Sequence, residues 1–147
     1  MSMITTNSVE ATESVAREWL AELKERPVTG RAEVVALLGD LGAGKTTFVQ
    51  AVARELGVTE AVTSPTFVIE KIYHLPSGEY FDHLIHIDCY RLDSSSELQH
   101  LGWEEIITDE RNLIMIEWGD KVAELLPPDH LTINFTFINE TTREIVW

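Results

Sequence analysis

The chain is poor in cysteine and in basic residues, and both shortages exclude classes of protein. Cys89 is the only cysteine, so an intrachain disulfide is impossible, and a free thiol suits a reducing compartment. Eleven Lys and Arg residues stand against 25 Asp and Glu, which gives a formal net charge of −14. Nucleic-acid backbones repel such a surface. We therefore expect any RNA target to be held by a partner, and an acidic face could instead bind a basic protein.

Long apolar segments are also missing. No run of about 18 apolar residues occurs, and the N-terminal segment MSMITTNSVEATESV lacks the basic and apolar regions of a signal peptide. We expect a cytoplasmic protein that does not interact with a membrane. With 147 residues, of which 44% are hydrophobic and 24% charged, the composition predicts a single domain spanning residues 1–147.

A phosphate-binding motif occupies residues 39–46, which read GDLGAGKT and match G-x-x-x-x-G-K-[ST] at every fixed position. Its glycines allow unusual backbone dihedrals and bring N–H groups close to phosphate oxygens. Lys45 can place a positive charge between the β- and γ-phosphates, and Thr46 can offer a hydroxyl to Mg²⁺. In an empty site we expect the Lys45 side chain to face solvent.

The flanking sequence has the order that this motif requires. Residues 33–38 form a short apolar run typical of a buried parallel strand. After the glycines, apolar residues recur at helical spacing until Gly57, a residue type that commonly ends helices. Strand, glycine loop and helix thus follow one another, and the helix N-terminus directs its partial positive charge toward a bound anion.

Periodicity and turn residues predict the remaining elements. The expected elements are a helix over 11–25, a β-hairpin around the turn at 76–79, a helix with a Ser94–Glu97 capping box and a break at Gly102, and strands over 112–117, 131–137 and up to Trp147. The predicted fold class is α/β: a three-layer P-loop NTPase fold with a mixed, mainly parallel central sheet and an added antiparallel hairpin.

Two carboxylates follow apolar strands, where a P-loop enzyme needs one to hold its metal or water. The segment LIHID ends in Asp88, and LIMIE ends in Glu117. Either residue could instead cap the element that follows its strand. In a chain that carries a P-loop, the pair indicates a second part of the phosphate site.

Four motifs in order resemble the TsaE (YjeE) family of bacterial P-loop ATPases. They are GDLGAGKTT, SPTF at 64–67, HIDCYR at 86–91 and EW at 117–118. The resemblance implies a Mg²⁺-dependent ATPase, weak by itself, that is required for threonylcarbamoyl modification of adenosine 37 in ANN-decoding tRNAs. It also implies a complex with the TsaD and TsaB proteins, through which tRNA is reached only indirectly.

The resemblance further implies roles for individual residues. Thr46 and Glu117 would hold Mg²⁺, while Asp88 would be the second essential carboxylate. Thr66 would belong to a nucleotide-sensing switch, and Lys45 would contact the β/γ oxygens. Thr12 would lie near the adenine. The catalytic set is then Asp88, Glu117, Lys45 and Thr66, and the ATP-binding set is Gly39, Asp40, Leu41, Gly42, Ala43, Gly44, Lys45, Thr46, Thr47, Thr12 and Trp118.

Other nucleotide-dependent functions compete with this interpretation. A GTPase is disfavoured, because no N-K-x-D base reader or D-x-x-G switch is present. A small-molecule kinase shares this fold and size, but usually carries an arginine-rich lid. The arginines that follow the loop are scattered singly, at positions 54, 91, 111 and 143. A nucleotide-gated binding module with little turnover is a third alternative.

Overall fold

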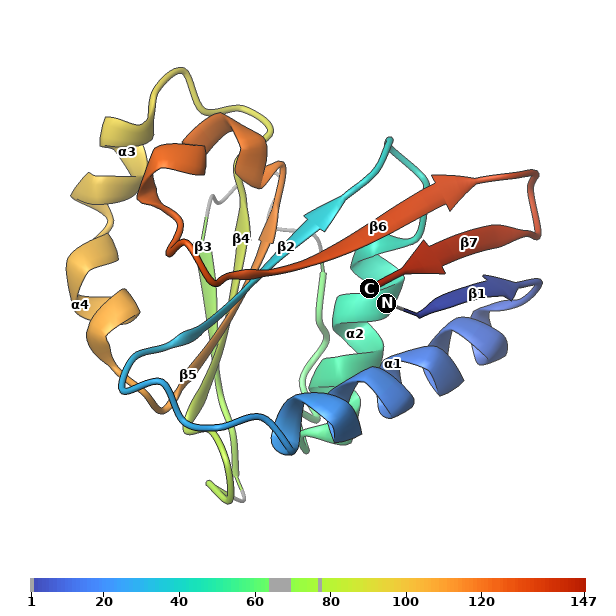
Figure 1. Cartoon of the computed structure of the whole chain (residues 1–147), viewed down its shortest axis with the longest axis horizontal. Coiled ribbons are helices and arrows are strands. Elements are labelled where there is room, and N and C mark those ends of the chain that lie inside the picture. The colour runs from blue at the N-terminus through green and yellow to red at the C-terminus, as the bar shows by residue number, and fades with distance from the viewer. Residues whose placement is uncertain (1, 64–69, 77) are drawn as a thin grey trace.

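The computed structural model describes residues 2–63, 70–76 and 78–147. Helices cover both faces of one central sheet, and the two ends of the chain lie side by side (Figure 1). No helix in the described part of the chain is long and apolar enough to cross a membrane.

The elements are, in chain order, β1 (Met3–Thr6), α1 (Val9–Lys24), β2 (Glu33–Leu38), α2 (Lys45–Glu55), β3 (Glu70–His74), β4 (His83–Asp88), α3 (Ser95–His100), α4 (Trp103–Thr108), β5 (Asn112–Glu117), the 3-10 helix η1 (Gly119–Leu125), β6 (Leu131–Phe137) and β7 (Arg143–Val146).

The seven strands of the sheet follow the order β1-β7-β6-β2-β5-β4-β3. The four neighbouring strands β6, β2, β5 and β4 run parallel to one another. Antiparallel strands extend this parallel core at both edges, with β3 on β4, β7 on β6 and β1 on β7. The predicted mainly parallel sheet with an added hairpin, β3–β4, is therefore confirmed.

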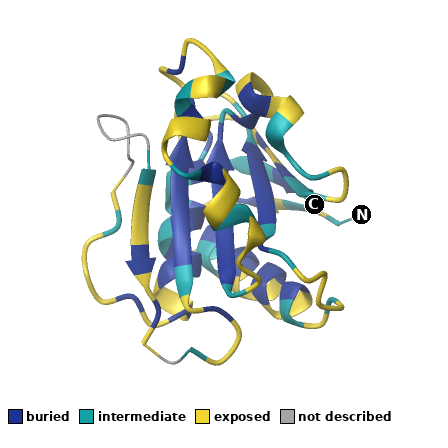
Figure 2. Ribbon diagram, turned by 90° about the vertical axis from the view of Figure 1, so that its left-hand side faces the viewer, coloured by how far each residue is buried: buried dark blue, intermediate teal, exposed yellow. Residues whose placement is uncertain are grey.

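Two hydrophobic clusters lie on opposite faces of the sheet, between the sheet and its covering helices, so the fold has three layers. On one face, α1 and α2 pack against alternate strand residues such as Leu84, Leu113 and Met115. On the other face, α3, α4 and η1 cover the intervening residues, such as Ile85 and Ile114. Because both faces are covered, the central strands are buried along almost their whole length (Figure 2), which explains their unbroken apolar runs.

Strand β1 is a strand that the sequence did not predict. Its sequence is MITT, which is too short to show an apolar run or a clear alternation, and Thr6 alone is buried. Pairing with β7 creates it, with Met3 opposite Val146 and Thr6 opposite Arg143. The predicted strands over 33–38, 112–117 and 131–137 have these bounds in the structure.

The capping box expected at Ser94 and Glu97 does not form. Ser94 does precede α3, but its hydroxyl makes no capping bond to the helix backbone and instead lies 2.7 Å from the Ser96 hydroxyl. The Ser94 hydroxyl thus hydrogen-bonds to the Ser96 side chain and not to the helix backbone. The break at Gly102 is confirmed, since Gly102 separates α3 from α4 with φ of 84°.

Gly39 is the point at which the phosphate loop leaves β2 and contacts β6. Its φ is +149°, and a Cβ at this position would lie 2.4 Å from the Phe135 carbonyl oxygen. That oxygen belongs to the backbone and has little room to move. Any side chain at residue 39 must therefore displace either the loop or β6.

We expect Gly39→Ala to lower the free energy of unfolding by about 3 kcal/mol, because the strained dihedral and the clash add to each other. Gly30→Ala is the matched control: its φ is +81°, but a Cβ there meets no atom within 4 Å, so backbone strain alone should cost about 1 kcal/mol. Urea unfolding followed by circular dichroism measures both. Equal losses in the two variants would contradict the close approach to Phe135.

Candidate functional site

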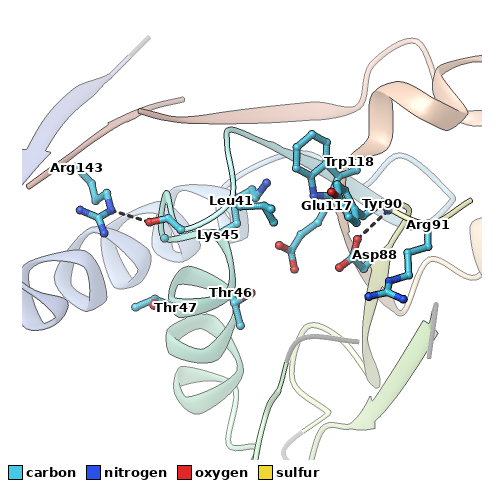
Figure 3. Close-up of a pocket in the computed structure, with 12 residues that line it drawn as sticks. Leu41, Lys45, Thr46, Thr47, Asp88, Tyr90, Arg91, Glu117, Trp118 and Arg143 are labelled. Atoms are coloured by element: carbon cyan, nitrogen blue, oxygen red, sulfur yellow. Dashed lines mark hydrogen bonds between the residues drawn. The ribbon is translucent and has the colours of Figure 1, made fainter. Parts of the chain in front are cut away.

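Parallel pairing brings three strand ends to one edge of the sheet. Leu37 of β2 lies opposite Glu117 of β5, and Glu117 lies opposite Asp88 of β4. The glycine loop follows β2 at the same edge. Together these segments surround a cleft of about 420 Å³. Thr46, Glu117 and Asp88, which come from three different elements, point toward one space in it (Figure 3).

The loop presents the open N-terminus of α2 to this cleft. Gly42 and Gly44 adopt positive φ values of 78° and 102°, which few residues other than glycine tolerate. Gly44 is the N-cap, and no side chain caps the helix there. The first N–H groups of α2 therefore have no side-chain acceptor and are available to an anion.

Lys45 is folded into the cleft wall, so the expectation that it faces solvent is wrong. Its side chain is 4% exposed. The ammonium group donates a hydrogen bond to the Gly39 carbonyl and lies 4.2 Å from the centre of the Trp118 ring. Burial lowers the pKa of Lys45 from its usual value, and the carboxylates of Glu117 and Asp88 oppose that shift. The buried cation thus has a backbone acceptor and an aromatic face as its partners.

The two strand-end carboxylates are both buried beside Lys45. Glu117 is 4% exposed, and its Oε2 lies 2.5 Å from His86 Nε2. Asp88 is 8% exposed, and its Oδ1 accepts a hydrogen bond of 2.9 Å from the Tyr90 backbone N–H. Buried carboxylates cost free energy unless they are hydrogen-bonded or paired. Each of them has a fixed orientation as a result.

Trp118 has a strained backbone next to the Glu117 carboxylate. Its φ of 60° and ψ of 37° lie in the left-handed region, and it is the one non-glycine residue with positive φ in the described part of the chain. A bulky residue there costs roughly 1–3 kcal/mol. The turn places the indole between the Lys45 ammonium and the Tyr90 ring, whose centroid is 5.1 Å away.

A second cavity, of about 320 Å³, adjoins the first. Thr12 lines it, as do residues of the β6–β7 turn, and it shares Gly44, Thr47 and Arg143 with the cleft. The Thr12 hydroxyl donates a hydrogen bond of 3.1 Å to the Thr6 hydroxyl. The structure thus brings Thr12 next to the glycine loop.

Most of the residues expected in the site line one of these cavities. Three further residues of the cleft were not among those expected in the site: Tyr90, Arg91 and Arg143. The first two lie in the HIDCYR motif, as does His86. Arg143 had no sequence signal; it comes from β7 and donates a 3.1 Å hydrogen bond to the Gly42 carbonyl (Figure 3). Thr66 and the SPTF segment lie outside the described residues, so their role stays a prediction.

The donors in the cleft suit a hard cation. Thr46 offers a hydroxyl, and the 2.5 Å contact to His86 uses only one oxygen of Glu117. Mg²⁺ prefers such oxygen ligands and commonly takes the rest from phosphates and water. No group of three His, Cys, Asp or Glu side chains in the described residues could hold a metal without such additional ligands. The residues present therefore fit a metal that arrives with a phosphate compound.

Comparison with known families gives an assignment that agrees with this geometry. The family model described as "Threonylcarbamoyl adenosine biosynthesis protein TsaE" matches residues 6–145. The chain belongs to the TsaE family. The matched residues of this TsaE-family protein include the glycine loop, both strands that end in carboxylates, and the C-terminal hairpin.

Individual TsaE relatives are similar over most of their length. The chain is 34% identical to tRNA threonylcarbamoyladenosine biosynthesis protein TsaE of Rickettsia typhi, over 96% of this chain and 90% of that protein. It is 40% identical to the protein of the same name from Treponema pallidum, over 76% and 78%. The crystal structure of Bacillus subtilis YdiB superposes with a TM-score of 0.73 at 30% identity, covering 98% of this chain and 82% of that one.

Cys89 lies between Asp88 and Tyr90 and is fully buried. Burial raises the pKa of its thiol to about 12, and the neighbouring carboxylate of Asp88 adds to the shift. Since a raised pKa favours the protonated thiol, the native protein at pH 8 holds roughly one thiolate in 10⁴ molecules. We expect no labelling by DTNB until the protein unfolds, and full labelling in urea. Rapid labelling of the folded protein would contradict this burial.

Proposed function

We propose that this protein is a Mg²⁺-dependent ATPase that supports threonylcarbamoyl modification of adenosine 37 in ANN-decoding tRNAs. The names of its relatives refer to this biosynthesis. The role places the protein in the cytoplasm, where it acts with the TsaB and TsaD proteins. The observation that supports the nucleotide site most directly is the meeting of Lys45, Thr46, Asp88 and Glu117 around one cleft.

The phosphate chain of ATP would occupy the cleft and draw Lys45 away from its present acceptor. The loop N–H groups and the ammonium group would then hold the β- and γ-phosphates. Thr46 and Glu117 would hold Mg²⁺, which when bound neutralises charge that develops on the transferring phosphoryl group. Asp88 would accept a hydrogen bond from the attacking water and orient it. The adjoining cavity, which Thr12 lines, would take the base of the nucleotide.

The charge of the protein supports a role within a complex. At a net charge of −14, the isolated chain has the wrong sign to attract tRNA. A partner must therefore supply the basic surface that binds the RNA. We expect ATP turnover to be coupled to that assembly and to be slow in the isolated chain.

The nucleotide site is tested with Lys45→Ala. Wild-type protein should gain about 2.7 kcal/mol of stability when ATP is present at a hundredfold excess over its dissociation constant. The variant should lose this gain, because the loop then lacks its cation. Lys71→Ala is the matched control, since the Lys71 ammonium also lies over an aromatic ring, 5.7 Å from the Tyr73 centroid, but away from the cleft. Thermal unfolding with and without Mg-ATP gives the result, and an ATP response preserved in Lys45→Ala would falsify the site.

The function itself is tested by tRNA binding and ATP turnover. We expect no binding of tRNA by the lone protein at physiological ionic strength, about 150 mM, and binding once the TsaB and TsaD proteins are added. ATP hydrolysis should rise in the complete mixture and fall to background with Asp88→Ala. Filter binding and phosphate release measure the two quantities.

A different result would favour the kinase alternative. Two arginines, Arg91 and Arg143, line the cleft together with Lys45, and a kinase needs such cations around the transferred group. Steady phosphate transfer to a small acceptor in the absence of partners would therefore support the kinase and contradict the complex-dependent ATPase.

A further inference from the structure

His86 is a buried polar residue that the proposed mechanism does not yet use. It lies on β4, two residues before Asp88, and its side chain is fully buried. Nε2 is 2.5 Å from Glu117 Oε2. Nδ1 is buried without a hydrogen-bond partner in the described part of the chain.

The register of the sheet fixes this contact. His86 lies opposite Met115, and Asp88 lies opposite Glu117, so the imidazole and the Glu117 carboxylate are diagonal neighbours on one face. Because both side chains project from the same face of adjacent parallel strands, they meet. Both residues belong to central strands that helices cover, so neither side chain has a solvent-exposed alternative position.

The two ring nitrogens of His86 have different roles. A carboxylate oxygen only accepts hydrogen bonds, so the nitrogen that faces Glu117 must carry the hydrogen. A hydrogen on Nδ1 would be a buried donor without an acceptor, which is costly. The environment therefore selects the tautomer with the hydrogen on Nε2, which leaves Nδ1 as a buried acceptor to which no group in the described residues donates.

We propose that His86 is a positioning residue for the magnesium ligand. By donating to Oε2 of Glu117, it would hold the carboxylate in one rotamer and leave Oε1 free to bind the metal. This inference rests on the proposed function, because it concerns a ligand of that site. Residues that hydrogen-bond to metal ligands change metal affinity by roughly 10–100-fold when they are removed.

Two substitutions at position 86 separate donation from packing. In His86→Gln, the amide nitrogen is as many bonds from Cα as Nε2 is, so the donor to Glu117 is retained. In His86→Asn, the amide nitrogen reaches only the position of Nδ1, so the donor is lost. His83→Asn is the matched control on the same strand: His83 faces Asn112, with Nδ1 and Oδ1 3.1 Å apart, and does not line the cleft.

The measurement is the affinity for ATP by calorimetry, in EDTA and over a Mg²⁺ titration. We expect His86→Asn to need roughly 10–100-fold more Mg²⁺ than wild type, with unchanged ATP affinity in EDTA. His86→Gln and His83→Asn should follow the wild-type titration. A wild-type titration curve for His86→Asn, or equal losses in the Gln and Asn variants, would overturn the proposal.

Two further outcomes separate this inference from the function on which it rests. If wild-type protein does not bind ATP in a Mg²⁺-dependent manner, both are wrong. If wild-type protein does bind ATP in this manner but His86→Asn needs no more Mg²⁺ than wild type, the ATPase proposal stands and the positioning role is wrong.

Long-range ¹H–¹⁵N NMR of the wild-type imidazole tests the tautomer without any variant. It should find the hydrogen on Nε2, and a hydrogen on Nδ1 alone would contradict the donation to Glu117.

Discussion

The parallel pairing of β2, β5 and β4 is the constraint on which the whole cleft depends. Parallel strands have their carboxyl ends at one edge of a sheet, and ligand sites of open α/β folds form outside that edge. The phosphate loop, Glu117 and Asp88 each follow or end one of these strands. Three segments that are far apart in the sequence therefore meet without any loop having to reach across the molecule.

Burial gives this charged edge its chemistry. The ammonium group of Lys45 and the carboxylates of Asp88 and Glu117 are all removed from water, so their interactions are stronger than on an open surface. The Lys45 ammonium group contacts a backbone carbonyl and the Trp118 ring. The strained turn at Trp118 puts that ring in place. A polyphosphate would offer the ammonium group a stronger acceptor, as the proposed nucleotide site requires.

The C-terminal hairpin completes the site from the other side. β6 lies against Gly39 at the start of the loop, and Arg143 of β7 holds the Gly42 carbonyl. The guanidinium group also donates to the Asn139 carbonyl in the hairpin turn, at 2.5 Å. The hairpin thus contacts the loop at its start, Gly39, and in its middle, Gly42, and the same hairpin lines the adjoining cavity.

The sequence by itself determined the phosphate loop, the buried strands at 33–38 and 112–117, and the hairpin, because these features have local signals: fixed glycine spacing, unbroken apolar runs and turn residues. Four motifs also identified the family. Only the tertiary structure decided the rest. β1 exists through its pairing with β7, and Arg143 enters the site across 101 residues of chain. Lys45 is buried and His86 contacts Glu117 because strand register and packing set their positions. Register and packing depend on contacts between segments that are far apart in the sequence, so the neighbouring residues do not predict them.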